Sequence, residues 1–168
     1  MSVDIRGYRP ADHPHCRDLW VELVEEHRRL YADGGFGGAD PGAGFEDYVT
    51  RLNLSGLWVA VTDADLIVGM TGLLIDGRHG EVDPLVVAEP MRESGIGTLL
   101  LERVTEEARR RELQYLSMRP FTRNVAGLRT LHDAGFTNLS RVTVTRPLAE
   151  TGPEPLAGIR LHDLDFDY

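Results

Sequence analysis

Hydrophobic and polar positions divide the first part of the chain into an apolar run and a segment of helical periodicity. The run over residues 3–9 predicts a strand. Asp12 follows it, and aspartate is one of the residues preferred at a helix N-cap. From there to Tyr31, apolar residues recur every three or four positions, while glutamates and arginines occupy the opposite side. The pattern therefore predicts a short strand followed by an amphipathic helix that ends near Tyr31.

Glycine dominates the next segment, residues 32–45, where six of the eleven residues from 34 to 44 are glycine. Neither a helix nor a strand is expected there, because glycine loses the most conformational freedom when a regular element forms. The segment is long for an ordinary connection, so it is either a lid or dispensable surface. Phe36 and Phe45 favour the lid because they offer apolar anchors, and a short helix is expected over residues 45–53.

Apolar runs rich in β-branched residues predict the central strands. The runs over 57–62 and 66–75 are joined by a short Asp-Ala-Asp turn, which is typical of a buried hairpin, and a third strand is expected over 81–88. The remaining predicted elements are a helix over residues 95–111, a strand over 113–118, a helix over 123–134, a strand over 138–145 and a last strand over about 158–168.

The order of these elements predicts the fold class. Antiparallel hairpins come first and two strand–helix–strand crossovers follow, which is typical of an α/β (α+β) protein. We expect a mixed, mostly antiparallel central sheet of about seven strands with helices on both faces. Because neither a linker nor an internal repeat interrupts the chain, residues 1–168 are interpreted as one domain.

Charge and hydropathy narrow the choice of partners. The net charge of −9 argues against a nucleic-acid partner, which needs a basic face. It is compatible with a cationic amine drawn to an acidic cleft, and equally with plain solubility. No apolar run is long enough to span a membrane, and the N-terminus lacks the apolar core of a signal peptide, so a cytoplasmic protein is expected.

Residue types that are rare or missing exclude several chemistries. Cys16 is the only cysteine and the six histidines are scattered, so neither an intramolecular disulfide nor a metal site is expected. All 18 basic residues are arginine. The absence of lysine excludes a Walker-A phosphate loop, which needs a Gly-Lys pair, and it excludes catalysis through a Schiff base.

The clearest candidate for ligand chemistry is the corner between the predicted strand over 81–88 and the helix that follows. Arg92, Gly95 and Gly97 stand there in the spacing Arg-x-x-Gly-x-Gly. The N-terminus of a helix attracts phosphate through its unpaired N–H groups, and glycines allow a ligand to approach the backbone. By itself the pattern fits either a phosphate loop or a packing corner, and Leu100 stands where a dinucleotide loop requires a third glycine.

A second block of residues supports a more specific assignment. Asn124, Gly135 and Phe136 match, with the right spacing, the helix-and-turn signature Asn-x-x-Ala-x-x-x-Tyr-x-x-x-Gly-Phe. Together with the glycine corner and the order of elements over nearly the whole chain, this block resembles the GNAT superfamily of N-acetyltransferases. The resemblance implies acetyl-coenzyme A (acetyl-CoA) as cofactor, bound by Leu85, Val86, Val87, Arg92, Glu93, Ser94, Gly95, Ile96, Gly97, Thr98 and Asn124.

Within that set, the resemblance assigns different parts of the cofactor to different residues. Pantetheine is expected to pair with the backbone of residues 85–87, where the strand splays from its neighbour, and pyrophosphate to lie on residues 92–98. A backbone N–H of Val86 or Val87 would polarise the thioester carbonyl. Glu93 departs from the family pattern, because it places a carboxylate near the negative charge of the pyrophosphate.

The chemistry also needs a group that accepts a proton from the amine. Glu81 and Asp83 are two residues apart on one strand and therefore share a face, so each is a candidate base or, alternatively, a solvent-facing residue. Glu81 is favoured, because its spacing from Arg92 is that of the general base in histone-type members. The tyrosine that protonates the leaving thiolate in many relatives is replaced by Leu131, which cannot donate a proton.

The resemblance therefore implies an N-acetyltransferase that acts on a small-molecule or peptide amine. A non-catalytic acyl-CoA-binding regulatory module is the alternative, motivated by Leu131. His27, Tyr31 and Phe36 are candidates to line the acceptor site, because the first helices and the segment after them shape that site in relatives. Homodimers are common among relatives, so a homodimer is compatible with this interpretation, and the identity of the acceptor stays open.

Overall fold

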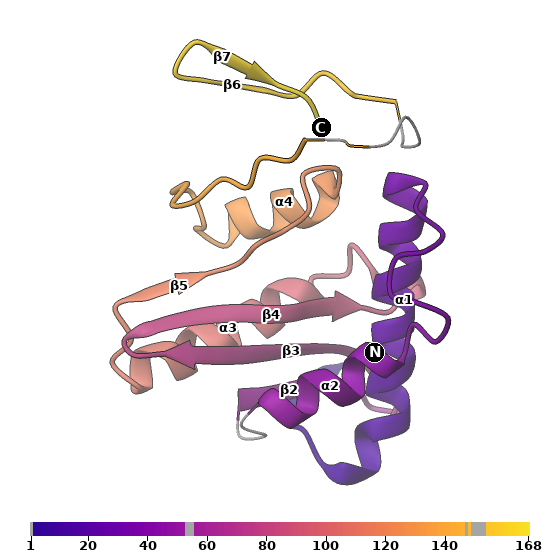
Figure 1. Ribbon diagram of the computed structural model, residues 1–168. Helices are drawn as coiled ribbons and strands as arrows, with labels where there is room; N and C mark the ends of the chain where they lie inside the picture. The colour runs from indigo at the N-terminus through magenta and orange to yellow at the C-terminus, as the bar shows by residue number, and fades with distance from the viewer. Residues whose placement is uncertain (1, 53–55, 147, 149–153) are drawn as a thin grey trace.

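A five-stranded sheet forms the centre of the protein, whose computed structural model describes residues 2–52, 56–146, 148 and 154–168 (Figure 1). The strand order is β1-β2-β3-β4-β5. Neighbouring strands run antiparallel from β1 to β4, and β5 is parallel to β4. The strands are β1 (Val3–Gly7), β2 (Leu57–Thr62), β3 (Ile67–Asp76), β4 (His79–Val87) and β5 (Tyr115–Ser117).

Helices cover both faces of this sheet. α1 and α2 pack on one face and α3 packs on the other, as Figure 1 shows. The helices are α1 (His13–Tyr31), α2 (Ala43–Arg51), α3 (Ile96–Arg110) and α4 (Val125–Asp133), and the short 3-10 turns are η1 (Pro10–Asp12) and η3 (Glu89–Met91). This mixed, mostly antiparallel sheet between helices confirms the predicted fold class.

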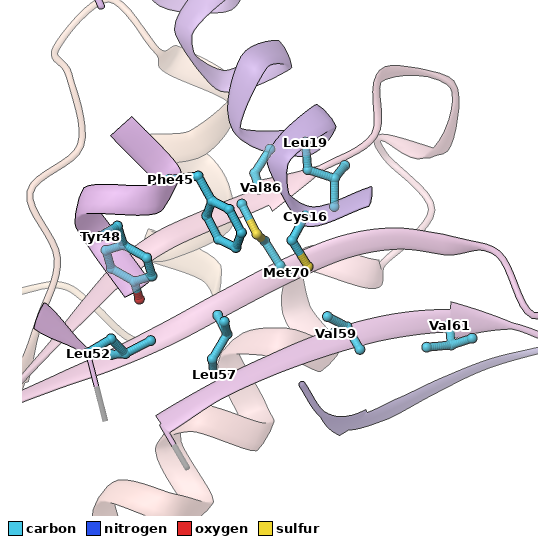
Figure 2. Packing of buried hydrophobic residues seen from close by; sticks show 10 residues of the cluster. All are labelled: Cys16, Leu19, Phe45, Tyr48, Leu52, Leu57, Val59, Val61, Met70 and Val86. Atoms are coloured by element: carbon cyan, nitrogen blue, oxygen red, sulfur yellow. The ribbon is translucent and has the colours of Figure 1, made fainter. Parts of the chain in front are cut away.

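The larger core lies between the sheet and the pair α1–α2. Figure 2 shows Phe45 of α2 beside Met70 of β3, with Tyr48 of α2 on the other side of Phe45, and none of the three side chains is exposed. The other members of this cluster are Cys16, Leu19, Leu52, Leu57, Val59, Val61 and Val86. Burying one large apolar side chain stabilises a fold by about 1.5–3 kcal/mol. The cluster therefore holds α1 firmly against the sheet and fixes the side of α1 that faces the candidate site.

Elements with a strong local pattern form where the sequence predicts them. The hairpin β2–β3, the end of α1 at Tyr31 and the helix α3 all lie within one residue of their predicted bounds. The short helix predicted over 45–53 forms two residues earlier as α2, and the last residue of that prediction, Asn53, lies outside the described residues. Residues 32–42 contain neither helix nor strand, as predicted, but residues 43–45, the end of the same predicted segment, belong to α2.

Asp12 stands at the N-cap of α1, but its carboxylate does not cap that helix. It accepts hydrogen bonds from the guanidinium of Arg6, at 2.7 and 2.9 Å, and from the N–H of Arg9, at 2.7 Å. The prediction of the position is confirmed, whereas the expected capping bond is wrong. A buried carboxylate gains more from a charged donor than from a helix N–H, and the arginine lowers the pKa of Asp12.

An irregularity in β4 decides which of its side chains face which helix. The register against β3 shifts by one residue between Val82 and Leu85, where the Asp83-Pro84 peptide is cis. Val82 consequently packs in the cluster with α3, while Val86, four residues later, packs in the core with α1 and α2. In a regular strand these two valines would share a face.

The C-terminal part of the chain departs from the prediction. Residues 137–146 are exposed and form no strand, so the strand predicted over 138–145 is wrong. The strand predicted over 158–168 is a separate hairpin, β6 (Ile159–Leu161) and β7 (Leu164–Phe166). The central sheet therefore has five strands, not about seven, among the described residues.

A local conformation explains the hairpin. Its two turn residues, His162 and Asp163, have φ values of 49° and 65°. Two consecutive residues with positive φ make the tight turn whose twist suits an antiparallel hairpin. For 138–145 the sequence favours a strand, but β structure also needs a neighbouring strand, and none of the described strands pairs with this segment.

Two kinds of feature are absent from the part of the chain that the structure describes. None of the helices there combines the length and apolarity needed to cross a membrane. Nor do the described residues bring three or more histidine, cysteine, aspartate or glutamate side chains together in a metal-binding arrangement.

Candidate functional site

β4 has an open backbone edge that leads into the glycine corner. β5 pairs with β4 only as far as Glu81, so none of the described strands pairs with that edge over residues 82–87. On its other edge β4 stays paired with β3 as far as Val87. The open N–H and C=O groups can bind an extended, amide-bearing ligand as an added strand would. The splay expected at residues 85–87 is therefore present.

Beyond this edge, the chain turns into the N-terminus of α3. Gly95 has a φ of 86°, a conformation that favours glycine, and a Cβ added there would touch nothing within 4 Å. A Cβ on Gly97 would lie 3.5 Å from Cγ2 of Thr130, an ordinary contact. Gly95 is thus required by backbone conformation, whereas position 97 has room for a Cβ.

The first turn of α3 offers unpaired backbone donors. The first backbone hydrogen bond at this end runs from the N–H of Leu99 to the carbonyl of Gly95, at 3.1 Å. The N–H groups before Leu99 have no helical carbonyl to bind, and together with the helix dipole they attract an anion. Ile96 is buried, whereas Thr98 is exposed beside these donors.

The side chains of the loop are arranged less simply than the motif suggests. The Ser94 hydroxyl donates to the carbonyl of Met91 at 2.5 Å, so it braces the loop. Glu93 is exposed and has a φ of 60°. Arg92 donates from Nε to the carbonyl of Val87, at 3.3 Å, and from Nη1 to Glu26 on α1, at 3.2 Å. The arginine expected to bind phosphate is therefore already held by two protein acceptors.

The two candidate bases lie close enough to influence each other, and they have different surroundings. Glu81 forms an ion pair with Arg119, whose Nε lies 2.6 Å from Glu81 Oε1. Burial raises the pKa of Asp83, and the charge of Glu81 raises it further, while Arg119 and Arg51 act in the opposite direction. A carboxylate with a raised pKa holds an accepted proton better, so the two residues are not equivalent as bases.

Three residues that the sequence did not single out complete the surroundings of these carboxylates. Arg119 comes from the connection after β5, and Arg51 from the last turn of α2. The buried Tyr48 donates its hydroxyl to the backbone carbonyl of Asp83. The only signal in the sequence was that Arg119 directly follows the predicted strand over 113–118, because the contacts themselves join distant segments.

The signature block forms α4, and its residues have structural roles. Asn124 caps the helix by accepting a hydrogen bond from the N–H of Gly127, at 2.9 Å. Leu131 is 4% exposed and packs with Leu101 and Val104 of α3, so the position of the missing tyrosine is part of the core. His132 is exposed on a different side of the helix.

The three candidate acceptor residues are brought together with a fourth aromatic. The ring of His27 lies 4.7 Å from Tyr31, 3.6 Å from Phe36 and 4.1 Å from Phe121, between ring centroids. His27 is 9% exposed, its Nδ1 has no hydrogen-bond partner, and burial lowers its pKa. Phe36 therefore anchors the glycine-rich segment to α1, and sequence reasoning missed Phe121.

Comparisons with known proteins agree with this architecture. A family model described as the acetyltransferase (GNAT) family matches residues 16–136. A search of curated proteins found no sequence match. Solved structures of similar fold include an acetyltransferase of the GNAT family from Staphylococcus aureus, which is 16% identical with a TM-score of 0.66, over 80% of this chain and 84% of that one.

Two further structures show the same fold. A ribosomal-protein-alanine N-acetyltransferase from Brucella melitensis is 22% identical with a TM-score of 0.63, over 79% of this chain and 83% of that one. AAC(6')-Iy, in complex with a bisubstrate analogue built from CoA and an acetylneamine, is 14% identical with a TM-score of 0.62, over 89% of this chain and all of that one. At these identities the likeness shows the fold alone.

Proposed function

Because the chain belongs to the acetyltransferase (GNAT) family, it is an N-acetyltransferase that uses acetyl-CoA, and we propose that it transfers the acetyl group directly to a primary amine of a small molecule or peptide in a ternary complex. One observation carries this proposal. β4 joins, along a single strand, a carboxylate pair, an open backbone edge and the loop before α3. A proton acceptor, a site for an extended ligand and an anion site thus follow one another.

The residues along β4 fit the cofactor. The open edge offers backbone groups to the amides of pantetheine, and the N–H of Val87, which faces this edge while that of Val86 faces β3, would polarise the thioester carbonyl. The unpaired N–H groups at the start of α3 suit the pyrophosphate. Nη2 of Arg92 has no partner among the described residues and can donate to a phosphate oxygen.

We assign the role of general base to Asp83. The amine must lose a proton, and a lysine-like amine with a pKa of about 10.4 costs roughly 4.6 kcal/mol to deprotonate at pH 7. Glu81 is paired with the guanidinium of Arg119. The pKa of Asp83, in contrast, is raised by burial and by the charge of Glu81. Asp83 therefore receives the proton, and Glu81 together with Arg119 sets the electrostatic field around it.

Bound acetyl-CoA supplies the thioester, whose C–S bond breaks as the amine nitrogen forms a bond to the carbonyl carbon. Asp83 would accept the first proton from the ammonium, directly or through water, release it to solvent, and then accept the second proton that the nitrogen loses as the amide forms. Leu131 cannot protonate the leaving sulfur. Because a thiol has a pKa near 8.5, CoA thiolate would be a tolerable leaving group without an acid from position 131.

The acceptor side is assigned to the end of α1 and the glycine-rich segment. His27, Tyr31 and Phe36 form an aromatic surface there with Phe121, and the net charge of −9 favours a cationic amine. Assembly as a homodimer and a cytoplasmic location stay predictions. Light scattering of the purified protein would test the first, and cell fractionation the second.

Thiol release tests the proposed function. Purified protein is incubated with acetyl-CoA and a panel of primary amines, both small molecules and peptides, and free CoA and acetylated amine are measured together. We expect one equivalent of thiol for each amine acetylated. Binding of acetyl-CoA without thiol release from any amine would instead support the non-catalytic regulatory module.

A further inference from the structure

One side of α1 is attached to the loop that precedes α3. The N–H of Glu89 donates to Oε2 of Glu22, at 2.9 Å, and Nη1 of Arg92 donates to Oε2 of Glu26, at 3.2 Å. Arg29 pairs with Glu26 and, at 3.5 Å, with Glu89. The three contacts between α1 and the loop connect residues that are 60 to 67 positions apart in the chain. The loop is thus tied to α1 at a backbone atom and at two side chains.

The spacing along α1 explains why these three residues act together. Glu22, Glu26 and Arg29 are four and three residues apart, so they lie on one side of the helix. Glu26 is shared by Arg29 and Arg92, and its charge raises the pKa of Arg29. With Glu22 and Glu89, which take part in the same contacts, the group contains three carboxylates and two guanidiniums. The pairing therefore orients Arg92, whose Nη2 stays without a partner among the described residues.

Two of the three nitrogens of the Arg92 guanidinium already donate to protein acceptors. Nε binds the carbonyl of Val87 and Nη1 binds Glu26, while Nη2 has no partner among the described residues. Two fixed nitrogens define the plane of a guanidinium, so the third is presented in one orientation. An arginine that is already ordered loses less side-chain freedom when a ligand binds.

We propose that Glu26 is a positioning residue for the pyrophosphate of CoA and acts through Arg92, with Glu22 and Arg29 holding the loop in register. This inference rests on the proposed function, because it needs the loop to bind the cofactor. Glu26 touches neither the reacting atoms nor the phosphate. Its contribution is to keep Arg92 in the orientation that presents Nη2, so it affects cofactor affinity and leaves the chemical step unchanged.

Two substitutions of Glu26 separate orientation from charge. Glu26→Ala removes the acceptor that holds Nη1, and we expect the Kd of CoA and the KM of acetyl-CoA to rise about three- to tenfold, with kcat within about twofold. Glu26→Gln keeps an oxygen acceptor, so it should rescue most of the loss. The matched control is Asp18→Ala, because Asp18 is an exposed carboxylate two turns earlier on the same helix and makes none of the loop contacts above.

S-acetylpantetheine, which lacks the pyrophosphate, distinguishes positioning from a general structural effect. We expect kcat/KM for this thioester to be the same in the wild type and in Glu26→Ala. An equal loss with both thioesters would overturn the proposal, because the substitution would then have disturbed the whole site. Tighter CoA binding in Glu26→Ala would also overturn it, since Glu26 would then act as a repelling charge.

The double variant Arg92→Ala/Glu26→Ala completes the test. If Glu26 acts through Arg92, its removal has no further effect on the Kd of CoA once Arg92 is absent. Additive effects would contradict the proposal. A wild-type protein that failed to bind CoA would overturn both this inference and the proposed function, whereas normal binding that Glu26→Ala leaves unchanged would overturn this inference alone.

Discussion

The two ends of β4 differ in which parts of the chain create their electrostatic environment. At the Val87 end, the chain presents backbone N–H groups at the start of α3, and residues within the motif shape the loop. At the Glu81 end, side chains from α2 and from the connection after β5 surround two carboxylates. A short stretch of backbone is thus enough to form a site that attracts an anion. Shifting the pKa of a carboxylate, in contrast, requires burial and charges from distant segments.

The largest expected effect lies at the carboxylate end. Asp83→Asn should lower kcat/KM by about 10²- to 10⁴-fold, because the variant loses its proton acceptor. The fold should persist, since Asp83 is in surroundings that already disfavour its charge. Thiol release under steady-state conditions measures the loss. Glu81→Gln is the matched variant, and a greater loss there would transfer the role of base to Glu81.

Removing the arginine at the other end should have a smaller effect of a different kind. Hydrogen bonds to charged groups contribute about 1.5–3 kcal/mol. We therefore expect Arg92→Ala to raise the KM of acetyl-CoA by roughly ten- to a hundredfold, with a smaller change in kcat. Initial rates at varied acetyl-CoA measure both constants. A fall in kcat with an unchanged KM would mean that Arg92 acts at the thioester instead.

Substituting the two loop glycines by alanine should lower the free energy of unfolding by different amounts. Gly95→Ala places a Cβ on a residue with a φ of 86°, which costs about 1–2 kcal/mol. Gly97→Ala makes only an ordinary 3.5 Å contact with Thr130 and should cost less. Chemical denaturation of both variants compares these free energies. A greater cost at Gly97 would show that the packing of α4, rather than backbone conformation, limits the corner.

The smallest expected effect is a shift in pH dependence. Because the pKa of Asp83 is raised, kcat/KM should rise with pH above the range of an ordinary aspartate. Glu81→Gln removes a charge that raises this pKa, so the acidic limb should move to lower pH. Arg119→Gln removes an opposing charge and should move it to higher pH. A pH–rate profile of each variant checks the two directions, and identical limbs would exclude Asp83 as the titrating group.

The same shift has a consequence for stability. A carboxyl group whose pKa is higher in the folded state than in the unfolded state stabilises the fold below its unfolded pKa, and this contribution is lost as pH rises through the folded pKa. Relative to the wild type, Asp83→Asn should therefore raise the free energy of unfolding more at neutral pH than at acidic pH. Denaturation of wild type and variant at two pH values would detect this difference.

Local patterns predicted much of the fold. The hairpin β2–β3 and the end of α1 at Tyr31 follow from apolar periodicity, and the family match confirms the expected acetyltransferase class and acetyl-CoA as cofactor. The hairpin β6–β7 was predicted as one strand, because the positive φ values of His162 and Asp163 leave no clear trace in residue type. The segment over 138–145 has the composition of a strand, yet no described strand pairs with it.

The candidate site also has a part that the sequence predicted and a part that only the tertiary structure decided. The spacing of Arg92, Gly95 and Gly97 determined the loop by itself, because a helix N-terminus and a left-handed glycine depend on neighbours within a few residues. Tertiary structure alone decided that Arg119 pairs with Glu81 and that Arg92 binds α1. Such contacts join residues 38 and 66 positions apart, so they exist only after the sheet has brought distant segments together.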